Sequence, residues 1–233
     1  MDLLRKIQVY GDSILKGIEL DSAEKYIVPK ESGWKYLEKQ YPLSIVNRAK
    51  FGCTASKGLE QLSRALEKGL ACDAVVLEYG GNDCDYDWAA VSAHPEGEHQ
   101  PHTPLPEFVR CCREMIRMLR ARGILPIVMS LPPIDAQRYF DWFCRQGLDK
   151  PAVLRWLGGD LQTIYRHQEM YSSALCRTAL EERAPLVDVR TSFLEAKNCR
   201  ELLCADGIHP NREGHQLIGK VFGEFASRYL QPA

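Results

Sequence analysis

The sequence predicts an α/β protein in which helices cover both faces of a parallel β-sheet. Short apolar β-rich runs alternate with longer segments of helix-like apolar spacing along the whole chain. The short runs lack a clean two-residue alternation, which is typical of strands buried on both faces. The chain has 233 residues, 45% of them hydrophobic and 26% charged, so its length and composition are those of a globular protein with a self-supporting core.

Five strands are expected, at residues 6–10, 43–47, 74–79, 124–130 and 186–189. The helical segments are residues 34–40, 55–70, 105–122, 161–183 and 212–230, the last with an apolar stripe and Asn211 as a candidate N-cap. Right-handed crossovers between parallel strands place every strand-to-helix loop at the carboxyl edge of the sheet. Ligands bind at that edge in such folds, so the residues that follow the strands are the first candidates for a site.

Two connections are too long for simple turns, at about 84–104 and 131–160. Both follow strands and should lie over the carboxyl edge. They carry seven aromatic residues, namely Tyr86, Trp88, Tyr139, Phe140, Trp142, Phe143 and Trp156. For most of these we expect a packing role that holds the insertions to the domain. No repeat or change of composition marks a boundary, so residues 1–233 are predicted to form one domain.

Charge and cysteine content exclude several classes of protein. The 30 Lys and Arg residues balance 31 Asp and Glu residues, and a net charge of -1 predicts no nucleic-acid or anionic-membrane partner. No apolar run approaches the roughly 18 residues of a membrane span. The apolar run at residues 7–10 is too short for a signal peptide, which predicts a cytoplasmic protein.

Nine cysteines without paired spacing favour neither a disulfide framework nor a zinc site. The oligomeric state stays open.

A candidate nucleophile and a candidate base stand near opposite ends of the chain. Ser13, in Gly-Asp-Ser-Ile-Leu, directly follows the first strand, where a strand-to-helix turn exposes a hydroxyl near a positive helix end. Asp206 precedes His209 by three residues, a spacing that lets a carboxylate reach imidazole Nδ1 and leaves Nε2 free to take a proton. Taken alone, the serine is more typical of a helix cap, and the Asp–His pair is equally consistent with capping.

Two further loop residues have the chemistry of oxyanion donors. Gly52, in Asn-Arg-Ala-Lys-Phe-Gly-Cys-Thr, lets backbone approach a substrate closely, and Asn82, in Gly-Gly-Asn-Asp, supplies a side-chain N–H. Ester hydrolysis passes through an oxyanion that needs such donors already in place. Taken singly, both residues are ordinary turn residues.

The combination of these four blocks resembles the SGNH (GDSL-type) hydrolase family, over residues 7 to about 222. The characteristic residues of the family match Ser13, Gly52, Asn82 and His209, in the same order, with Asp206 three residues before the histidine. The resemblance implies a flavodoxin-like three-layer sandwich with strand order 2-1-3-4-5. It also implies an esterase or lipase-type activity that needs neither a metal nor an organic cofactor.

On this basis we expect a serine esterase with Ser13, Asp206 and His209 as the catalytic residues and Ser13, Gly52 and Asn82 around the oxyanion. The expected partner is a small-molecule ester, with a short acyl group on a small or carbohydrate alcohol. The aromatic residues of the insertions could stack on sugar rings. They could equally line an acyl groove, which would suit a lysophospholipase or thioesterase that acts on longer chains.

Other interpretations remain open. The fold could serve as a non-catalytic glycan- or partner-binding module. A dinucleotide or flavin site is disfavoured because no Gly-x-Gly-x-x-Gly follows the first strand. Residues 94–102 hold three histidines and two glutamates without the spacing of a known metal site. Their prolines and glycine favour a solvated loop, and a polar lid beside Asn82 is a better functional interpretation than a metal site. Asp12, Asp83 and Asp188 are expected to be structural: a cap, an anchor for the Asn82 loop and a partner of loop backbone.

Overall fold

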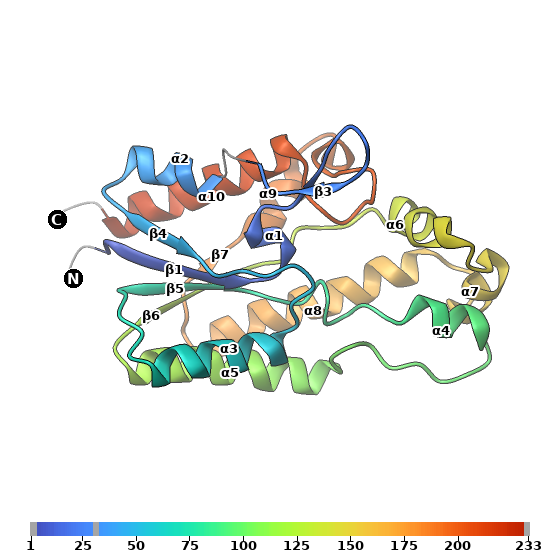
Figure 1. Cartoon of the computed structure of the whole chain (residues 1–233), viewed down its shortest axis with the longest axis horizontal. Coiled ribbons are helices and arrows are strands. Elements are labelled where there is room, and N and C mark those ends of the chain that lie inside the picture. Colours follow the sequence, from blue (N-terminus) through green and yellow to red (C-terminus); the bar gives the residue numbers. More distant parts are fainter. Residues whose placement is uncertain (1–3, 30–32, 231–233) are drawn as a thin grey trace.

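The central sheet has the predicted topology. The computed structural model describes residues 4–29 and 33–230, so residues 30–32 and both ends of the predicted domain 1–233 lie outside the described residues. Five parallel strands run in the order β4-β1-β5-β6-β7, which is 2-1-3-4-5 along the chain (Figure 1). The predicted fold class and strand order are confirmed, whereas the single-domain assignment stays a prediction.

The strands of this sheet lie close to their predicted positions. They are β1 (Lys6–Gly11), β4 (Ser44–Asn47), β5 (Ala74–Glu78), β6 (Leu125–Met129) and β7 (Leu186–Val187). Every residue of β5 is buried, as expected for a central strand covered on both faces. The last predicted strand is too long, because Asp188 caps a helix there and accepts a hydrogen bond from the Thr191 N–H.

Helices cover the sheet on both sides (Figure 1). On one side lie α2 (Gly33–Gln40), α9 (Val189–Glu195) and α10 (Arg212–Leu230), and on the other α3 (Ala55–Glu67), α5 (Leu105–Ala121) and α8 (Gln162–Glu181). The first layer buries Phe193 and Phe222, and the second buries Phe108 and Tyr171. The predicted cap of α10 is confirmed, since the Gly214 N–H donates to Asn211 Oδ1 at 3.0 Å.

Several short elements were not predicted. They are α1 (Ser13–Lys16), the antiparallel pair β2 (Glu19–Leu20) and β3 (Tyr26–Ile27), α4 (Trp88–Ala93), α6 (Ala136–Phe143), η1 (Cys144–Gln146), α7 (Lys150–Trp156) and η2 (Cys199–Leu202). Elements of this length contain too few residues for a periodic apolar pattern. The two insertions supply α4, α6 and α7, which lie beyond the carboxyl ends of the strands (Figure 1). The insertions therefore build a separate wall over the edge where a site is expected.

No helix in residues 4–29 and 33–230 is both long enough and apolar enough to cross a membrane.

Candidate active site

Ser13, His209 and Asp206 form one continuous line of hydrogen bonds. Ser13 Oγ lies 2.8 Å from His209 Nε2, and His209 Nδ1 lies 2.6 Å from Asp206 Oδ2. All three residues are buried. A carboxylate can only accept at Nδ1, so the imidazole carries its proton there and Nε2 is left to accept from the serine hydroxyl. The structure therefore brings together three residues that are separated by up to 196 positions.

The turn at residues 206–209 holds the histidine by local bonds. Asp206 Oδ1 accepts from the N–H groups of Ile208 and His209, both at 3.1 Å. Burial would raise the pKa of Asp206, but the hydrogen bond and charge of His209 and these backbone bonds hold its pKa below the usual value. Gly207 adopts a φ of 74°, and an added Cβ there would lie 2.6 Å from the Asp135 carbonyl oxygen of the second insertion. The carboxylate thus stays ionised and keeps the ring oriented.

Ser13 is the first helical residue of α1, so its N–H has no acceptor inside the helix. Asp12 is the N-cap, and its Oδ1 accepts from the Ile14 N–H at 2.9 Å. Its other oxygen, Oδ2, accepts from Asn82 Nδ2 at 3.0 Å. Asp12 is therefore the predicted cap and, in addition, the group that orients the Asn82 amide.

Asn82 follows β5 through a turn that requires glycine. Gly80 has a φ of 139°, and a Cβ there would lie 2.6 Å from the Leu131 side chain. The next residue, Asp83, is fully buried, and its carboxylate accepts from the Ala55 N–H at 2.9 and 3.1 Å. Ala55 begins α3, three residues after Gly52. Asp83 thus anchors the Asn82 loop, as predicted, and ties it to the segment that contains Gly52.

Gly52 lies in the turn before α3 with a φ of 67°. Its neighbour Phe51 stacks on the His209 ring, with centroids 5.9 Å apart and an angle of 15° between the planes. Unlike Ser13 and Asn82, Gly52 is not among the described residues that line the cavity next to His209. The structure therefore places Gly52 next to a residue that stacks on His209, outside the wall of this cavity.

A cavity of about 530 Å³ opens next to Ser13, Asn82 and His209. Six of the seven aromatic residues of the insertions line it, namely Tyr86, Trp88, Tyr139, Trp142, Phe143 and Trp156. The expectation that most of these rings only pack the insertions is wrong, because they line the cavity as well as packing against one another. The remaining ring, Phe140, packs in the apolar cluster behind this wall.

Two aromatic residues near the histidine were missed by sequence reasoning. Phe51 stacks on His209, and the Tyr26 ring lies edge-on to it at 5.1 Å. Phe51 is next to Gly52 in the quoted motif, so a large ring beside the site was visible in the sequence. Tyr26 belongs to the β2–β3 pair, which carried no signal. These rings narrow the space around the imidazole.

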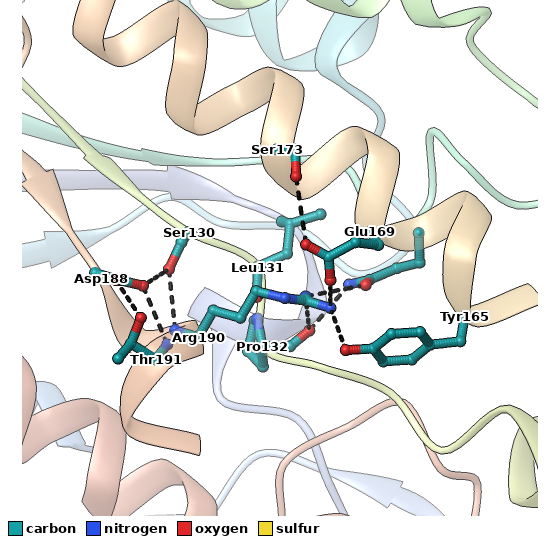
Figure 2. Close-up of polar contacts among 10 residues, drawn as sticks. Ser130, Leu131, Pro132, Tyr165, Glu169, Ser173, Asp188, Arg190 and Thr191 are labelled. Carbon is teal, nitrogen blue, oxygen red and sulfur yellow. Dashed lines mark hydrogen bonds and ion pairs between the residues drawn. The ribbon is translucent and has the colours of Figure 1, made fainter. Parts of the chain in front are cut away.

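A buried guanidinium supports the other side of the cavity and was also missed. Arg190, at the start of α9, donates to the carbonyl oxygens of Leu131 and Pro132 at 3.1 and 3.4 Å. It also donates to Gln168 Oε1 at 3.1 Å and the Tyr165 hydroxyl at 3.0 Å, and it forms an ion pair with Glu169 (Figure 2). Leu131, Pro132 and Gln168 line the cavity, so Arg190 fixes this part of its wall. An arginine just after an apolar strand was the available signal.

The strand ends themselves carry two further acids. Glu78, the last residue of β5, is fully buried and lines the cavity, and neither of its carboxyl oxygens has a hydrogen-bond partner among the described residues. Burial and the nearby Asp12 carboxylate raise the pKa of Glu78 well above its usual value. A glutamate at the end of an otherwise apolar strand was the signal for it. Asp188 accepts from Ser130 Oγ at 3.0 Å and caps α9, which is a structural role, as expected.

The histidine-rich stretch at residues 94–102 lies beside Asn82 but does not cover the cavity as a lid would. His102 Nδ1 lies 3.0 Å from the Asn82 carbonyl oxygen, so the stretch does run beside Asn82. However, none of its described residues lines the cavity. Within the described ranges, no three His, Cys, Asp or Glu side chains are grouped closely enough to hold a metal ion.

A parallel α/β sheet with serine, histidine and aspartate hydrogen-bonded in line at its carboxyl edge is the arrangement of serine hydrolases. Residues 9–217 match the GDSL-like lipase/acylhydrolase family, and the chain belongs to that family. It is a carboxylic ester hydrolase.

Several known proteins are similar over most of the chain. The isoamyl acetate-hydrolyzing esterase of Saccharomyces cerevisiae is 25% identical over 235 residues, which cover 96% of this chain and 88% of that protein. The GDSL esterase/lipase CPRD49 of Arabidopsis thaliana is 25% identical over 75% of this chain and 62% of its own length. The crystal structure of a lipase/acylhydrolase from Enterococcus faecalis has a TM-score of 0.67 at 20% identity, covers 99% of both chains and supports the fold.

Proposed function

We propose that this protein hydrolyses carboxylic esters through an acyl-enzyme formed on Ser13. His209 Nε2 takes the proton of the Ser13 hydroxyl as the oxygen attacks the ester carbonyl, and it then protonates the leaving alcohol. A water molecule activated by the same nitrogen releases the acid and restores the serine. The observation that carries the proposal is the line of hydrogen bonds from Ser13 Oγ through His209 to Asp206, at 2.8 and 2.6 Å.

The oxyanion of the intermediate is proposed to accept from the N–H groups of Ser13 and Gly52 and from Asn82 Nδ2. The Ser13 N–H is supported by its position at the start of α1, where the helix supplies no acceptor. Asn82 is supported by its bond to Asp12, which uses one of the two amide hydrogens and leaves the other for the substrate. Gly52 is proposed on the family motif alone.

The proposed substrate is an ester of a short acid whose alcohol part occupies the aromatic end of the cavity. Tyr26 and Phe51 crowd His209 and favour a small acyl group there. The yeast relative is named for an acetate ester of an apolar alcohol, which agrees with this arrangement. A carbohydrate alcohol that stacks on the same rings would suit the same short acyl group.

A second candidate is a longer acyl chain in the aromatic end, as in a lysophospholipase or thioesterase. The rings of both insertions favour it, because they present apolar surface to the cavity. Against a phosphate-bearing lipid, no lysine or arginine is among the described residues that line this cavity. A non-catalytic binding module is disfavoured, since such a module needs no hydrogen-bonded nucleophile and base.

The test is hydrolysis of p-nitrophenyl esters from acetate to palmitate by the wild type and by Ser13→Ala. Loss of the nucleophile should lower turnover by at least about 10⁴. The control is Ser63→Ala, a serine on the outer helix α3, which should keep full activity. Optimal activity on acetate supports the short-acyl substrate and an optimum at long chains supports the second candidate. Serine-independent hydrolysis would overturn the mechanism.

A further inference from the structure

The aromatic end of the cavity contains a carboxylate held by neutral donors. Asp85 lines the cavity, and its Oδ1 accepts from Trp88 Nε1 at 2.8 Å. Its Oδ2 accepts from the Tyr139 hydroxyl at 2.6 Å. Burial raises the pKa of Tyr139 well above its usual value, so this hydroxyl keeps its proton and donates it. Burial raises the pKa of Asp85, and the hydrogen bonds from Tyr139 and Trp88 oppose that shift. Two donors on its two oxygens suit the ionised form, which a cation in the cavity would stabilise further.

No cationic side chain of the cavity wall balances this charge. No lysine or arginine is found among the described residues that line the cavity, and burial lowers the pKa of His167, the histidine beside the Tyr86 ring. The buried Arg190 is directed elsewhere, toward backbone carbonyls and Glu169 (Figure 2). His102, which contacts the Asp85 backbone, is exposed to solvent. Buried charges are normally paired, so a carboxylate without a cation at a cavity indicates a place for a cationic ligand.

Aromatic rings surround the same region. Tyr86 packs edge-on to Trp156 with centroids 4.9 Å apart, and Trp88 stacks on Phe143 at 4.4 Å. Trp88 also lies edge-on to Trp156 at 6.1 Å, so these four rings form a continuous part of the wall next to Asp85. The faces of Trp, Tyr and Phe carry negative potential and attract cations. An apolar wall with an added negative charge suits a cation whose charged nitrogen is surrounded by apolar groups.

The kind of cation follows from the number of hydrogen-bond acceptors that the wall offers to its N–H groups. A primary ammonium has three N–H donors and needs acceptors, whereas a trimethylammonium group has none and is satisfied by ring faces and a nearby negative charge. Asp85 already accepts from Trp88 and Tyr139, and the neighbouring side chains of Trp88, Phe143 and Trp156 carry no acceptor. The wall therefore fits an N-methylated ammonium better than a free amine.

We propose that the aromatic end of the cavity, with Asp85 and the rings of Tyr86, Trp88 and Trp156, binds the alkylammonium group of a choline-type ester. This rests on the proposed function, since the same cavity reaches Ser13 and His209. The reaction is ordinary hydrolysis: the ester bond is broken by water, and the products are the short acid and the amino alcohol. The ammonium group takes no part in the chemistry and positions the ester.

The first test compares acetylcholine with 3,3-dimethylbutyl acetate in the wild type. The two esters share their acyl group and shape and differ in a positive nitrogen against a neutral carbon. We expect kcat/KM to be at least about tenfold higher for acetylcholine, mainly through KM. Equal values, or a preference for the neutral ester, overturn the proposal. Hydrolysis of p-nitrophenyl acetate is measured in parallel. If this ester is cleaved, equal values contradict only the choline-ester proposal, and if it is not cleaved, the proposed esterase function fails too.

The second test assigns the preference to one carboxylate. Asp85→Asn should reduce the ratio of the two kcat/KM values to about one. The matched control Glu98→Gln removes an exposed acid from the same insertion and should leave the ratio unchanged. An unchanged ratio in a folded Asp85→Asn variant contradicts the assignment. If that variant does not fold, choline and 3,3-dimethyl-1-butanol are compared as inhibitors of the wild type, and weaker or equal inhibition by choline overturns the proposal.

Discussion

The two ends of the cavity differ in how their polar groups are held in place. At the Ser13 end, His209 is held by Asp206 of the same turn, and the Asn82 amide is held by Asp12 of a neighbouring loop. At the aromatic end, Asp85 is held by a tyrosine 54 residues away. The histidine is therefore oriented by its own turn, whereas Asp85 also depends on the packing of two insertions against each other.

This difference predicts a division of effects. Substitutions at the Ser13 end should lower kcat, because they remove groups that act on the reacting atoms. Substitutions behind the aromatic end should change stability, KM or substrate preference, because they alter the shape and charge of the binding space. Four further substitutions challenge or refine this division.

The largest effect is expected for Asp206→Asn. An asparagine can offer an N–H to His209 Nδ1, which then favours the tautomer with a proton on Nε2, and this tautomer cannot accept from Ser13. We expect kcat to fall by about 10⁴ with p-nitrophenyl acetate as substrate. Asp160→Asn, which removes a surface partner of Arg166, serves as the control. Activity within tenfold of the wild type would show that Asp206 does not orient the base.

Asn82→Ala should lower kcat by about 10²–10³, since it removes one proposed oxyanion donor. KM should change little, because the amide is needed only as charge develops on the oxygen. The steady-state parameters are compared with those of Asn198→Ala, an exposed asparagine outside the cavity. A raised KM at unchanged kcat would instead assign Asn82 to the binding end.

Arg190→Met tests the wall behind the aromatic end. The substitution leaves the carbonyl oxygens of Leu131 and Pro132 without their donor and breaks the ion pair with Glu169. We expect the free energy of unfolding to fall by about 3 kcal/mol and KM to rise, with kcat nearly unchanged. Arg155→Met, an exposed arginine, is the control in denaturant titrations. A loss of kcat without loss of stability would contradict the division.

The smallest effect concerns pH and Asp83, which links the Asn82 loop to the segment that contains Gly52. Burial raises the pKa of Asp83 to about 6, against 3.8 for a free carboxyl. The folded state therefore holds this proton more tightly than the unfolded state, and the contribution of Asp83 to stability falls as pH rises. Between about pH 4.5 and pH 7 this loss amounts to about 2 kcal/mol.

Asp83→Asn removes this titration and keeps an oxygen for the Ala55 N–H. As pH rises from about 4.5 to 7, the wild type should lose about 2 kcal/mol of unfolding free energy that the variant does not lose. Urea titrations at both pH values measure it, and other buried acids cancel because both proteins contain them. A difference that does not depend on pH would show that Asp83 stays ionised throughout.

The long elements and the strand order were predictable because each rests on a strong signal. The helices α5, α8 and α10 extend over several turns of apolar spacing, and the strand order was implied by the family resemblance. Short elements were not predictable: α1 contains four residues and β2 two. The same limit explains why the last strand was predicted two residues too long. Asp188 caps the short helix α9 there, and a helix of seven residues gives no periodic signal.

The sequence was sufficient to predict that Ser13, Asn82, Asp206 and His209 lie together, although not that Tyr26 and Phe51 pack beside them. The loops after parallel strands converge on one edge, and the Asp206–His209 spacing brings carboxylate and imidazole together within one turn. The arrangement of the aromatic end could be known only from the packed structure. The contacts of Asp85 with Tyr139, and of Arg190 with Leu131, join segments 54 and 59 residues apart. Neither segment's own pattern encodes such a contact, because it depends on how helices pack across a space that no single segment defines.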